Sequence, residues 1–316
     1  MIVSLIIIGI IILVLFWSAT LIFFNDKSSK IIEVDDNKVF SDKCKSIILK
    51  HEIKKDTAVF MIHGYLSTPN VYQYSAHSFF EEGYDAFAYL LPGFGTSVDD
   101  FKKTTFSDWF NYISLKYEKI RKEYENVIIV GISMGGSITL KLGEKYCNTN
   151  LEPTAIIPIS APVIYNSLIR DRKITNFYFY FARFISIFKK TFNPSICNRV
   201  NEESNNDNNN NWIGYSGIFL KQSMSFIKAE KKIRKDLKNI TCPMFVIHNI
   251  TDKTVPFFNF SIIAKENNSR HFEAKIIKMN GFKHTMHVLL LYYSVREELT
   301  YNIINFIEGV FDEQKR

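Results

Sequence analysis

The sequence predicts an α/β fold in which helices cover both faces of a mostly parallel central sheet and a helical cap is inserted between two strands. Three observations predict it. Strand-like runs alternate with helical patterns, several of these runs are apolar throughout, as strands buried in a parallel sheet are, and a serine between glycines stands where one run meets a helix. With 316 residues, 47% of them hydrophobic, the chain is long enough for one such domain and an insertion.

The amino-terminal stretch predicts a transmembrane helix ahead of this domain. Residues 1–24 carry no charged side chain, and a helix needs about 20 apolar residues to cross a bilayer. A cleaved signal peptide is the alternative, but the stretch has no positive amino-terminal region and its apolar core is long. We therefore expect an uncleaved anchor over 1–24, a linker over 25–45 and the main domain over 46–316.

The orientation of such an anchor depends on few charges. Asp26, Lys27 and Lys30 follow the apolar run, and no charge precedes it. Because basic residues favour the inner side of a membrane, this pattern predicts a single-pass protein whose main domain is cytoplasmic.

The first half of the domain alternates strands and helices. Its elements are expected at 46–50 (strand), 57–62 (strand), 70–82 (helix), 85–91 (strand), 106–124 (helix) and 126–132 (strand). Thr105 and Asp108 have the spacing of a capping box at the start of the second helix. This alternation builds parallel crossovers with the functional groups at the carboxyl ends of the strands.

The segment 126–137 predicts a nucleophile. Gly131 and Gly135 stand two residues either side of Ser133, which suits a turn so tight that its neighbours tolerate no Cβ. The amide of Met134 then lies at the amino end of a helix expected over 134–146, where an oxyanion is favoured. The loop after the strand 57–62 would bring the amide of Tyr65 beside it, as a second donor.

The cap is expected over about 164–227, between a strand at 155–159 and one at 242–248. Phe177, Phe181, Phe184 and Phe188 recur at helical spacing among basic residues, which predicts a lid helix. Two interpretations remain open: an aromatic roof over an acyl pocket, or a helix lying in a membrane interface. The asparagine-rich stretch 201–211 predicts a disordered loop.

A serine needs an imidazole to take its proton and a carboxylate to orient that imidazole. Asp252 follows the strand 242–248, and His284 follows the last expected strand, 273–279, before a final helix at 294–311. The chain order Ser, Asp, His is that of a nucleophile elbow fold. His287 is the rival base, and the distance of His284 from the last strand favours His284.

Other classes of function lack support in the sequence. The net charge of +7 comes without a nucleic-acid recognition motif, and it suits an anionic membrane surface equally well. The widely spaced Cys44, Cys147, Cys197 and Cys242 do not have metal-ligand spacing and are interpreted as free thiols. We expect no metal, no cofactor and no nucleic-acid partner.

Several motifs together resemble the bacterial carboxylesterase and monoacylglycerol lipase family of α/β hydrolases. They are His63-Gly64-Tyr65, the Thr-Thr-Phe-Ser-Asp-Trp run at 104–109, Gly131 to Gly136, Cys242-Pro243, and Asp252 with Val255-Pro256. The resemblance implies an α/β-hydrolase fold with Ser133 as nucleophile, Asp252 as acid, His284 as base, and Tyr65 and Met134 as oxyanion donors. Phe94 departs from it, because the family commonly has histidine there, while His287-Val288 echoes the family's His-Val entry to the last helix.

The sequence therefore predicts a membrane-anchored serine esterase that acts on acyl glycerols, lysolipids or similar small lipid esters through an acyl-enzyme. Its partners would be the substrate and a membrane, contacted through residues 1–24 and the aromatic cap. The alternatives are a peptidase or thioesterase with the same triad and, less favoured, a membrane interaction protein without activity.

Overall fold

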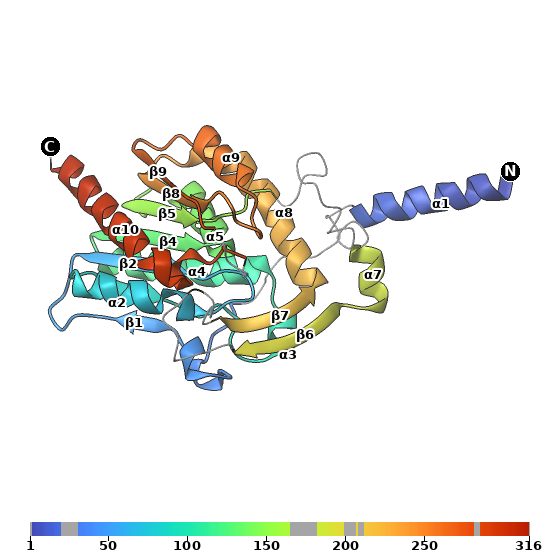
Figure 1. Ribbon diagram of the computed structural model, residues 1–316, viewed down its shortest axis with the longest axis horizontal. Coiled ribbons are helices and arrows are strands. Elements are labelled where there is room, and N and C mark those ends of the chain that lie inside the picture. Colours follow the sequence, from blue (N-terminus) through green and yellow to red (C-terminus); the bar gives the residue numbers. More distant parts are fainter. Residues whose placement is uncertain are drawn as a thin grey trace.

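The computed structural model describes residues 2–19, 31–164, 182–198, 207, 212–280 and 285–315. Its centre is a seven-stranded sheet with the order β1-β3-β2-β4-β5-β8-β9 (Figure 1). β1 is antiparallel to β3, and every other neighbouring pair is parallel. The strands are β1 (Ile47–Leu49), β2 (Thr57–Ile62), β3 (Asp85–Ala88), β4 (Asn126–Ile132), β5 (Ala155–Ile159), β8 (Met244–Asn249) and β9 (Phe272–Ile277).

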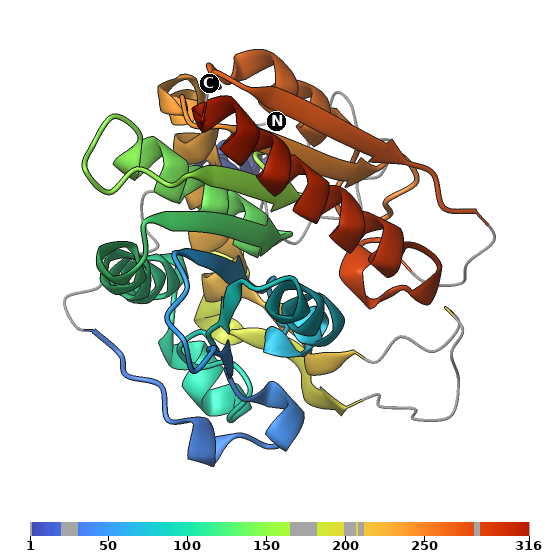
Figure 2. The same ribbon diagram turned by 90° about the vertical axis from the view of Figure 1, so that its left-hand side faces the viewer.

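Helices cover both faces of this sheet. Those of the main domain are α2 (Gln73–Glu81), α3 (Val98–Lys103), α4 (Phe106–Glu123), α5 (Met134–Tyr146), α9 (Phe258–Glu266) and α10 (Tyr293–Gln314). Figure 2 shows α10 lying across one face of the sheet, and α2 lies beside it. The two helical layers explain why the parallel strands are apolar throughout, as the sequence predicts.

β2 illustrates how one strand serves two cores. All six of its residues are buried. Phe60 and Ile62 belong to the core that includes α4 and α5, whereas Val59 and Met61 belong to the core on the side of α2 and α10. Side chains of a strand alternate between faces, so this one run builds both cores.

The capping box predicted at the start of α4 is confirmed. The carboxylate of Asp108 accepts hydrogen bonds from both the amide and the hydroxyl of Thr105, each at 2.8 Å. Such a box satisfies amide groups that the first turn of a helix leaves unpaired.

The inserted cap differs from an all-helical lid. It contains α7 (Ala182–Phe188), an antiparallel hairpin of β6 (Thr191–Asn198) and β7 (Ile213–Phe219), and α8 (Leu220–Asp236), which extends past the expected boundary at 227. α8 packs against α4 and α5, so the cap and the main domain share one apolar core. The hairpin was not expected from sequence, and Phe192, Ile218 and their neighbours find partners across it.

Much of the predicted lid helix lies outside the described residues. This holds for Phe177 and Phe181, and for the asparagine-rich stretch 201–211 apart from Asp207. Phe188, at the end of α7, has 77% of its surface exposed. The choice between an aromatic roof and an interfacial helix therefore stays a prediction.

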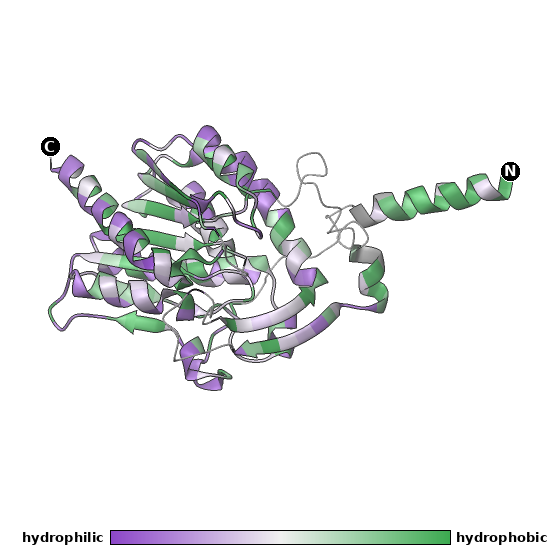
Figure 3. Cartoon of the chain, viewed as in Figure 1, coloured by the Kyte–Doolittle hydropathy of each residue, from purple (hydrophilic) through white to green (hydrophobic). Residues whose placement is uncertain are grey.

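The prediction of a single-pass membrane anchor is wrong. Within the described residues, the structure contains no helix whose length and apolar character suffice to span a bilayer. The apolar helix α1 (Ile2–Ala19; green in Figure 3) has 18 residues, and positions 20–24 of the expected anchor lie outside the described residues. The cytoplasmic placement, which was inferred from the anchor, is withdrawn with it.

Candidate active site

Ser133 sits in a strained turn between β4 and α5. Its φ of 57° and ψ of −122° lie outside the regions that residues with a side chain usually adopt. A Cβ on Gly135 would lie 1.9 Å from the carbonyl oxygen of Ile62, and one on Gly131 would lie 2.2 Å from the carbonyl oxygen of Gly135. Backbone packs so closely on this turn that only glycine fits at both positions, as the sequence predicts.

The loop after β2 packs directly against this turn. A Cβ on Gly64 would lie 3.1 Å from the Cβ of Ser133, so the two segments are in contact. Tyr65 follows Gly64, and Met134 begins α5, whose amino end carries unpaired amide groups. Tyr65 and Ser133 line one cavity of about 370 Å³. The two amides proposed as oxyanion donors therefore belong to segments that meet at Ser133.

His63 holds the shape of this loop. It is buried, its Nδ1–H donates to the carbonyl oxygen of Gly64 at 3.1 Å, and its Nε2 accepts from the amide of Leu91 at 3.1 Å. Because burial disfavours the charged imidazolium, the pKa of His63 falls to about 4. His63 is therefore a neutral structural residue at pH 7.

The side chain of Tyr65 connects the same loop to the cap. Its hydroxyl and the hydroxyl of Ser223 in α8 form a hydrogen bond of 3.0 Å. Its ring packs against Trp109 of α4 and Phe226 of α8, with centroid distances of 6.0 and 6.2 Å. A movement of α8 relative to the sheet would therefore disturb the backbone beside Ser133.

Asp252 lies in the loop after β8, and its carboxylate is completely buried. Its Oδ1 accepts from the amides of Thr254 at 2.7 Å and Val255 at 2.9 Å. Its Oδ2 accepts from the Nδ1–H of His287 at 2.7 Å. With one oxygen held by backbone and the other by an imidazole, the carboxylate fixes the orientation and the tautomer of that ring.

The structure brings Asp252 together with His287, the rival of the base preferred from sequence. His284, the preferred one, lies outside the described residues. With its Nδ1–H on the carboxylate, His287 has its lone pair on Nε2. Among the described residues this buried nitrogen has no hydrogen-bond partner, and His287 lines the same cavity as Ser133. The cavity of Ser133 is thus lined by a histidine that is hydrogen-bonded to a buried carboxylate, and these are the residue types that a serine nucleophile requires.

Polar side chains from other elements hold the loop of His287. Asn249, at the end of β8, donates to the carbonyl oxygen of Met286 at 2.8 Å. The hydroxyl of Tyr292 accepts from the amide of Met286 at 3.0 Å, and the amide of Lys253 donates to the carbonyl oxygen of Thr285 at 3.0 Å. The position of His287 therefore depends in part on Asn249 and Lys253, which are more than 30 positions away in the chain.

A second buried histidine lies near the carboxylate without competing for it. The Nε2–H of His248 donates to the carbonyl oxygen of Val255 at 3.1 Å and lies 4.0 Å from Oδ2 of Asp252. Burial lowers the pKa of His248, so the ring is neutral at pH 7. Asp252 therefore keeps its short hydrogen bond with His287.

The remaining wall of the cavity comes largely from the cap hairpin and the loops after β2 and before α10. Sequence reasoning missed the hairpin residues Cys197, Trp212 and Tyr215, because they become neighbours only when β6 and β7 pair. No aspartate or glutamate is among the described residues that line it. In the described part of the chain, no group of three or more histidine, cysteine, aspartate or glutamate residues has the arrangement of a metal site.

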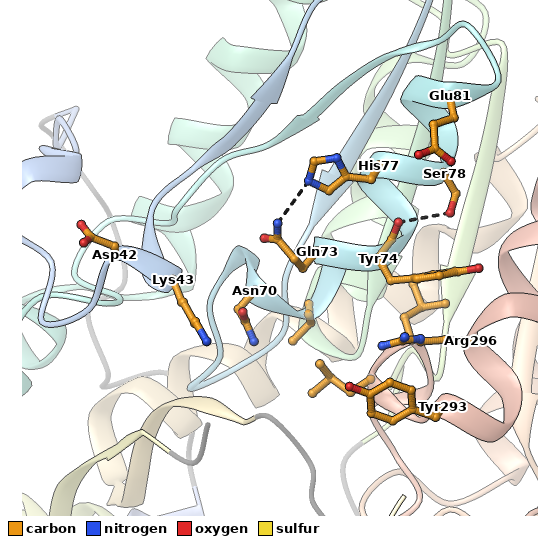
Figure 4. Close-up of a pocket in the computed structure, with 13 residues that line it drawn as sticks. Asp42, Lys43, Asn70, Gln73, Tyr74, His77, Ser78, Glu81, Tyr293 and Arg296 are labelled. Carbon is orange, nitrogen blue, oxygen red and sulfur yellow. Dashed lines mark hydrogen bonds between the residues drawn. The ribbon is translucent and has the colours of Figure 1, made fainter. Parts of the chain in front are cut away.

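A larger cavity of about 740 Å³ lies between α2 and α10, and neither Ser133 nor His287 lines it (Figure 4). It does contain a serine and a histidine. However, the hydroxyl of Ser78 donates to the carbonyl oxygen of Tyr74, and the Nε2 of His77 pairs with the side chain of Gln73. Neighbours in their own helix engage both groups, so this cavity does not offer a second nucleophile–base pair.

Comparisons with known proteins agree with this geometry. The sequence profile of the family described as "Serine aminopeptidase, S33" matches residues 53–288. A thermostable monoacylglycerol lipase from Bacillus sp. (strain H-257) is 31% identical over 105 residues, which cover 33% of this chain and only 40% of that lipase. Putative esterase/lipase 3 of Mycoplasma genitalium is 27% identical over 223 residues, or 68% of this chain and 77% of that protein.

A solved structure reported for the metagenome-derived lipolytic enzymes LipS and LipT has the same fold. It superposes with a TM-score of 0.68 at 17% identity, covering 89% of this chain and all of that one. At this level of identity the likeness concerns the fold alone, which is that of the α/β hydrolases.

Proposed function

This chain belongs to the serine aminopeptidase S33 family of α/β hydrolases, and from that premise we propose that it is a carboxylesterase of the monoacylglycerol lipase type, acting through an acyl-enzyme on Ser133. One observation carries the proposal. The Nδ1 of His287 lies 2.7 Å from the buried carboxylate of Asp252, while its Nε2 is left unpartnered among the described residues that surround the cavity of Ser133.

In the proposed reaction, the Nε2 of His287 takes the proton of Ser133 as its Oγ attacks the ester carbonyl. Asp252 stabilises the resulting imidazolium. The amides of Tyr65 and Met134 hold the oxyanion. His287 then gives its proton to the leaving alcohol, and a water activated by the same nitrogen releases the fatty acid from Ser133.

The lining of the cavity supports an ester with an acyl chain over a peptide with a free amino terminus. Leu66, Trp212, Val288 and Leu291 present apolar surface to it. Binding a free amino group calls for a carboxylate, and no aspartate or glutamate is among the described residues that line the cavity, since Asp252 is fully buried behind His287. The monoacylglycerol lipase from Bacillus, similar over part of its length, supports the same substrate class.

The test measures fatty acid release from a monoacylglycerol by the purified protein and by Ser133→Ala. We expect the wild type to release fatty acid and the rate to fall by about 10⁴-fold or more in the variant, because no other group replaces Ser133 as the nucleophile. Ser216→Ala, at an exposed serine that lines the same cavity, is the matched control and should keep most activity. Equal release by wild type and Ser133→Ala would remove Ser133 from the reaction.

A panel of substrates separates the rival chemistries. Acyl esters, aminoacyl amides and acyl thioesters of matched chain length are compared by kcat/KM, with a fluorophosphonate probe reporting an active serine in each preparation. The proposal expects the esters to be cleaved fastest. Labelling at Ser133 with faster cleavage of amides or thioesters would keep the triad and overturn the substrate class.

A further inference from the structure

Two cysteines meet near the amino ends of the parallel strands, at the edge of the sheet opposite to Ser133. Cys147 follows the last residue of α5, and Cys242 lies two residues before β8. They are 95 positions apart in the chain, yet the amide of Cys242 donates to the sulfur of Cys147 at 3.4 Å. The amide of Thr241 donates to the same sulfur, also at 3.4 Å.

Two backbone amides directed at one sulfur favour the thiolate over the thiol, because each stabilises negative charge. The thiol of Cys242 adds a third donor, and together these hydrogen bonds lower the pKa of Cys147 to about 6, whereas the pKa of Cys242 is raised. The hydrogen bonds therefore favour a thiolate on Cys147 beside a thiol on Cys242. A thiolate beside a thiol is the arrangement from which a disulfide forms.

We propose that Cys147 and Cys242 are a redox pair, which a peroxide converts to a disulfide joining the end of α5 to the start of β8. Burial limits the oxidant to a small molecule, because Cys147 is 8% exposed and Cys242 is fully buried. The proposal goes beyond the proposed hydrolase function and does not depend on it.

The reaction takes two steps. The thiolate of Cys147 attacks one peroxide oxygen, so an S–O bond forms, the O–O bond breaks, and the leaving hydroxide takes a proton to become water. The sulfur of Cys242 then attacks the sulfenic acid of Cys147. An S–S bond forms, the S–O bond breaks, and hydroxide leaves as water with the proton of Cys242. In sum, one thiolate, one thiol, one hydrogen peroxide and one proton from solvent give one disulfide and two waters.

Cys44 provides an internal reference. It is as buried as Cys242, but burial raises the pKa of its thiol to about 12, and no second cysteine is hydrogen-bonded to it in the described part of the chain. We therefore expect Cys44 to stay reduced at peroxide concentrations that oxidise the pair.

The experiment treats the purified full-length chain with hydrogen peroxide, blocks free thiols after unfolding, and maps the peptides by mass spectrometry. The expected product is a peptide pair linked through Cys147 and Cys242 that has lost two hydrogens and is restored by dithiothreitol, with Cys44 still alkylated. The oxidised protein should also unfold at a higher temperature, because the link closes a long loop.

Single variants test the order of the steps. Cys242→Ala should leave Cys147 as a sulfenic acid that dimedone traps, whereas Cys147→Ala should leave Cys242 reduced. The wild-type mapping keeps the proposal testable even if either variant fails to fold. Two alkylated thiols at 147 and 242 after peroxide treatment, or oxidation of Cys147 to a sulfinic acid without a link, would overturn it. None of these measurements uses ester hydrolysis, so a negative result for the cysteine pair is distinct from a negative result for the esterase proposal.

Discussion

The turn of Ser133 and the loop of His287 each place one side chain at the same edge of the sheet, but they are held in different ways. The turn is held by backbone packing, with glycine at both positions where a Cβ would collide with a carbonyl group. The loop is held by hydrogen bonds from outside its own backbone, above all from the distant side chain of Asn249 and the amide of Lys253. A backbone-held position can be recognised in the local sequence, whereas a position held by distant side chains cannot.

The largest expected effect comes from breaking the backbone-held turn. Gly135→Ala puts a Cβ 1.9 Å from a backbone oxygen, and we expect it to lower the free energy of unfolding by more than about 3 kcal/mol and to abolish activity. Gly309→Ala is the matched control, because nothing lies within 4 Å of its Cβ in α10. It should stabilise the protein by about 0.5–1 kcal/mol. Urea unfolding measures both, and equal effects would contradict the steric account.

The loop of His63 combines both kinds of support, because it packs against the turn of Ser133 and is also held by the neutral side chain of His63. The pKa of His63 is about 4 when folded, against 6.5 as its ordinary value, so the unfolded chain binds the proton first as pH falls. The stability that this residue contributes is present above about pH 6.5 and is lost toward pH 4, up to about 3 kcal/mol. Unfolding of wild type and His63→Gln across this range should show a shallower pH slope in the variant, and parallel slopes would contradict a buried neutral histidine.

A smaller effect is expected from loosening the side-chain-held loop. Asn249→Ala removes the hydrogen bond to Met286, and we expect a loss of about 2 kcal/mol in unfolding free energy together with a roughly 10-fold lower kcat. Asn267 is a matched control, because its side chain also donates to a carbonyl group, that of Ile263 at 2.8 Å, at the end of α9. Asn267→Ala should lower stability without lowering kcat. A fall in kcat for both variants would show that kcat follows stability alone.

Much of the fold was predictable because its signals are local. Apolar runs marked the buried strands, Thr105 and Asp108 marked the start of α4, and the glycines around Ser133 marked the turn. The cap hairpin was not predictable, because β6 and β7 are separated by a long insertion and gain their apolar contacts only on pairing. The anchor expected over 1–24 is the other part of the prediction that the described residues do not support.

The candidate site was likewise predictable only where the signal is local in the sequence. Ser133 directly follows β4 and Asp252 follows β8, so strand ends were enough to place both at one edge of the sheet, while their catalytic roles stay predictions. The choice between His284 and His287 was not local, since it depends on where Asn249, Lys253 and Tyr292 hold the loop. Spacing from the last strand favoured His284, while the contacts in the structure favour His287 as the proposed base.

The most direct measurement compares kcat/KM for ester hydrolysis in His287→Ala and His284→Ala, with folding of both checked by their unfolding curves. If His287 is the base held by Asp252, its variant loses about 10⁴-fold in kcat/KM, while His284→Ala stays within a few-fold of wild type. A folded His287→Ala protein with near wild-type activity, beside an inactive His284→Ala protein, would contradict the account.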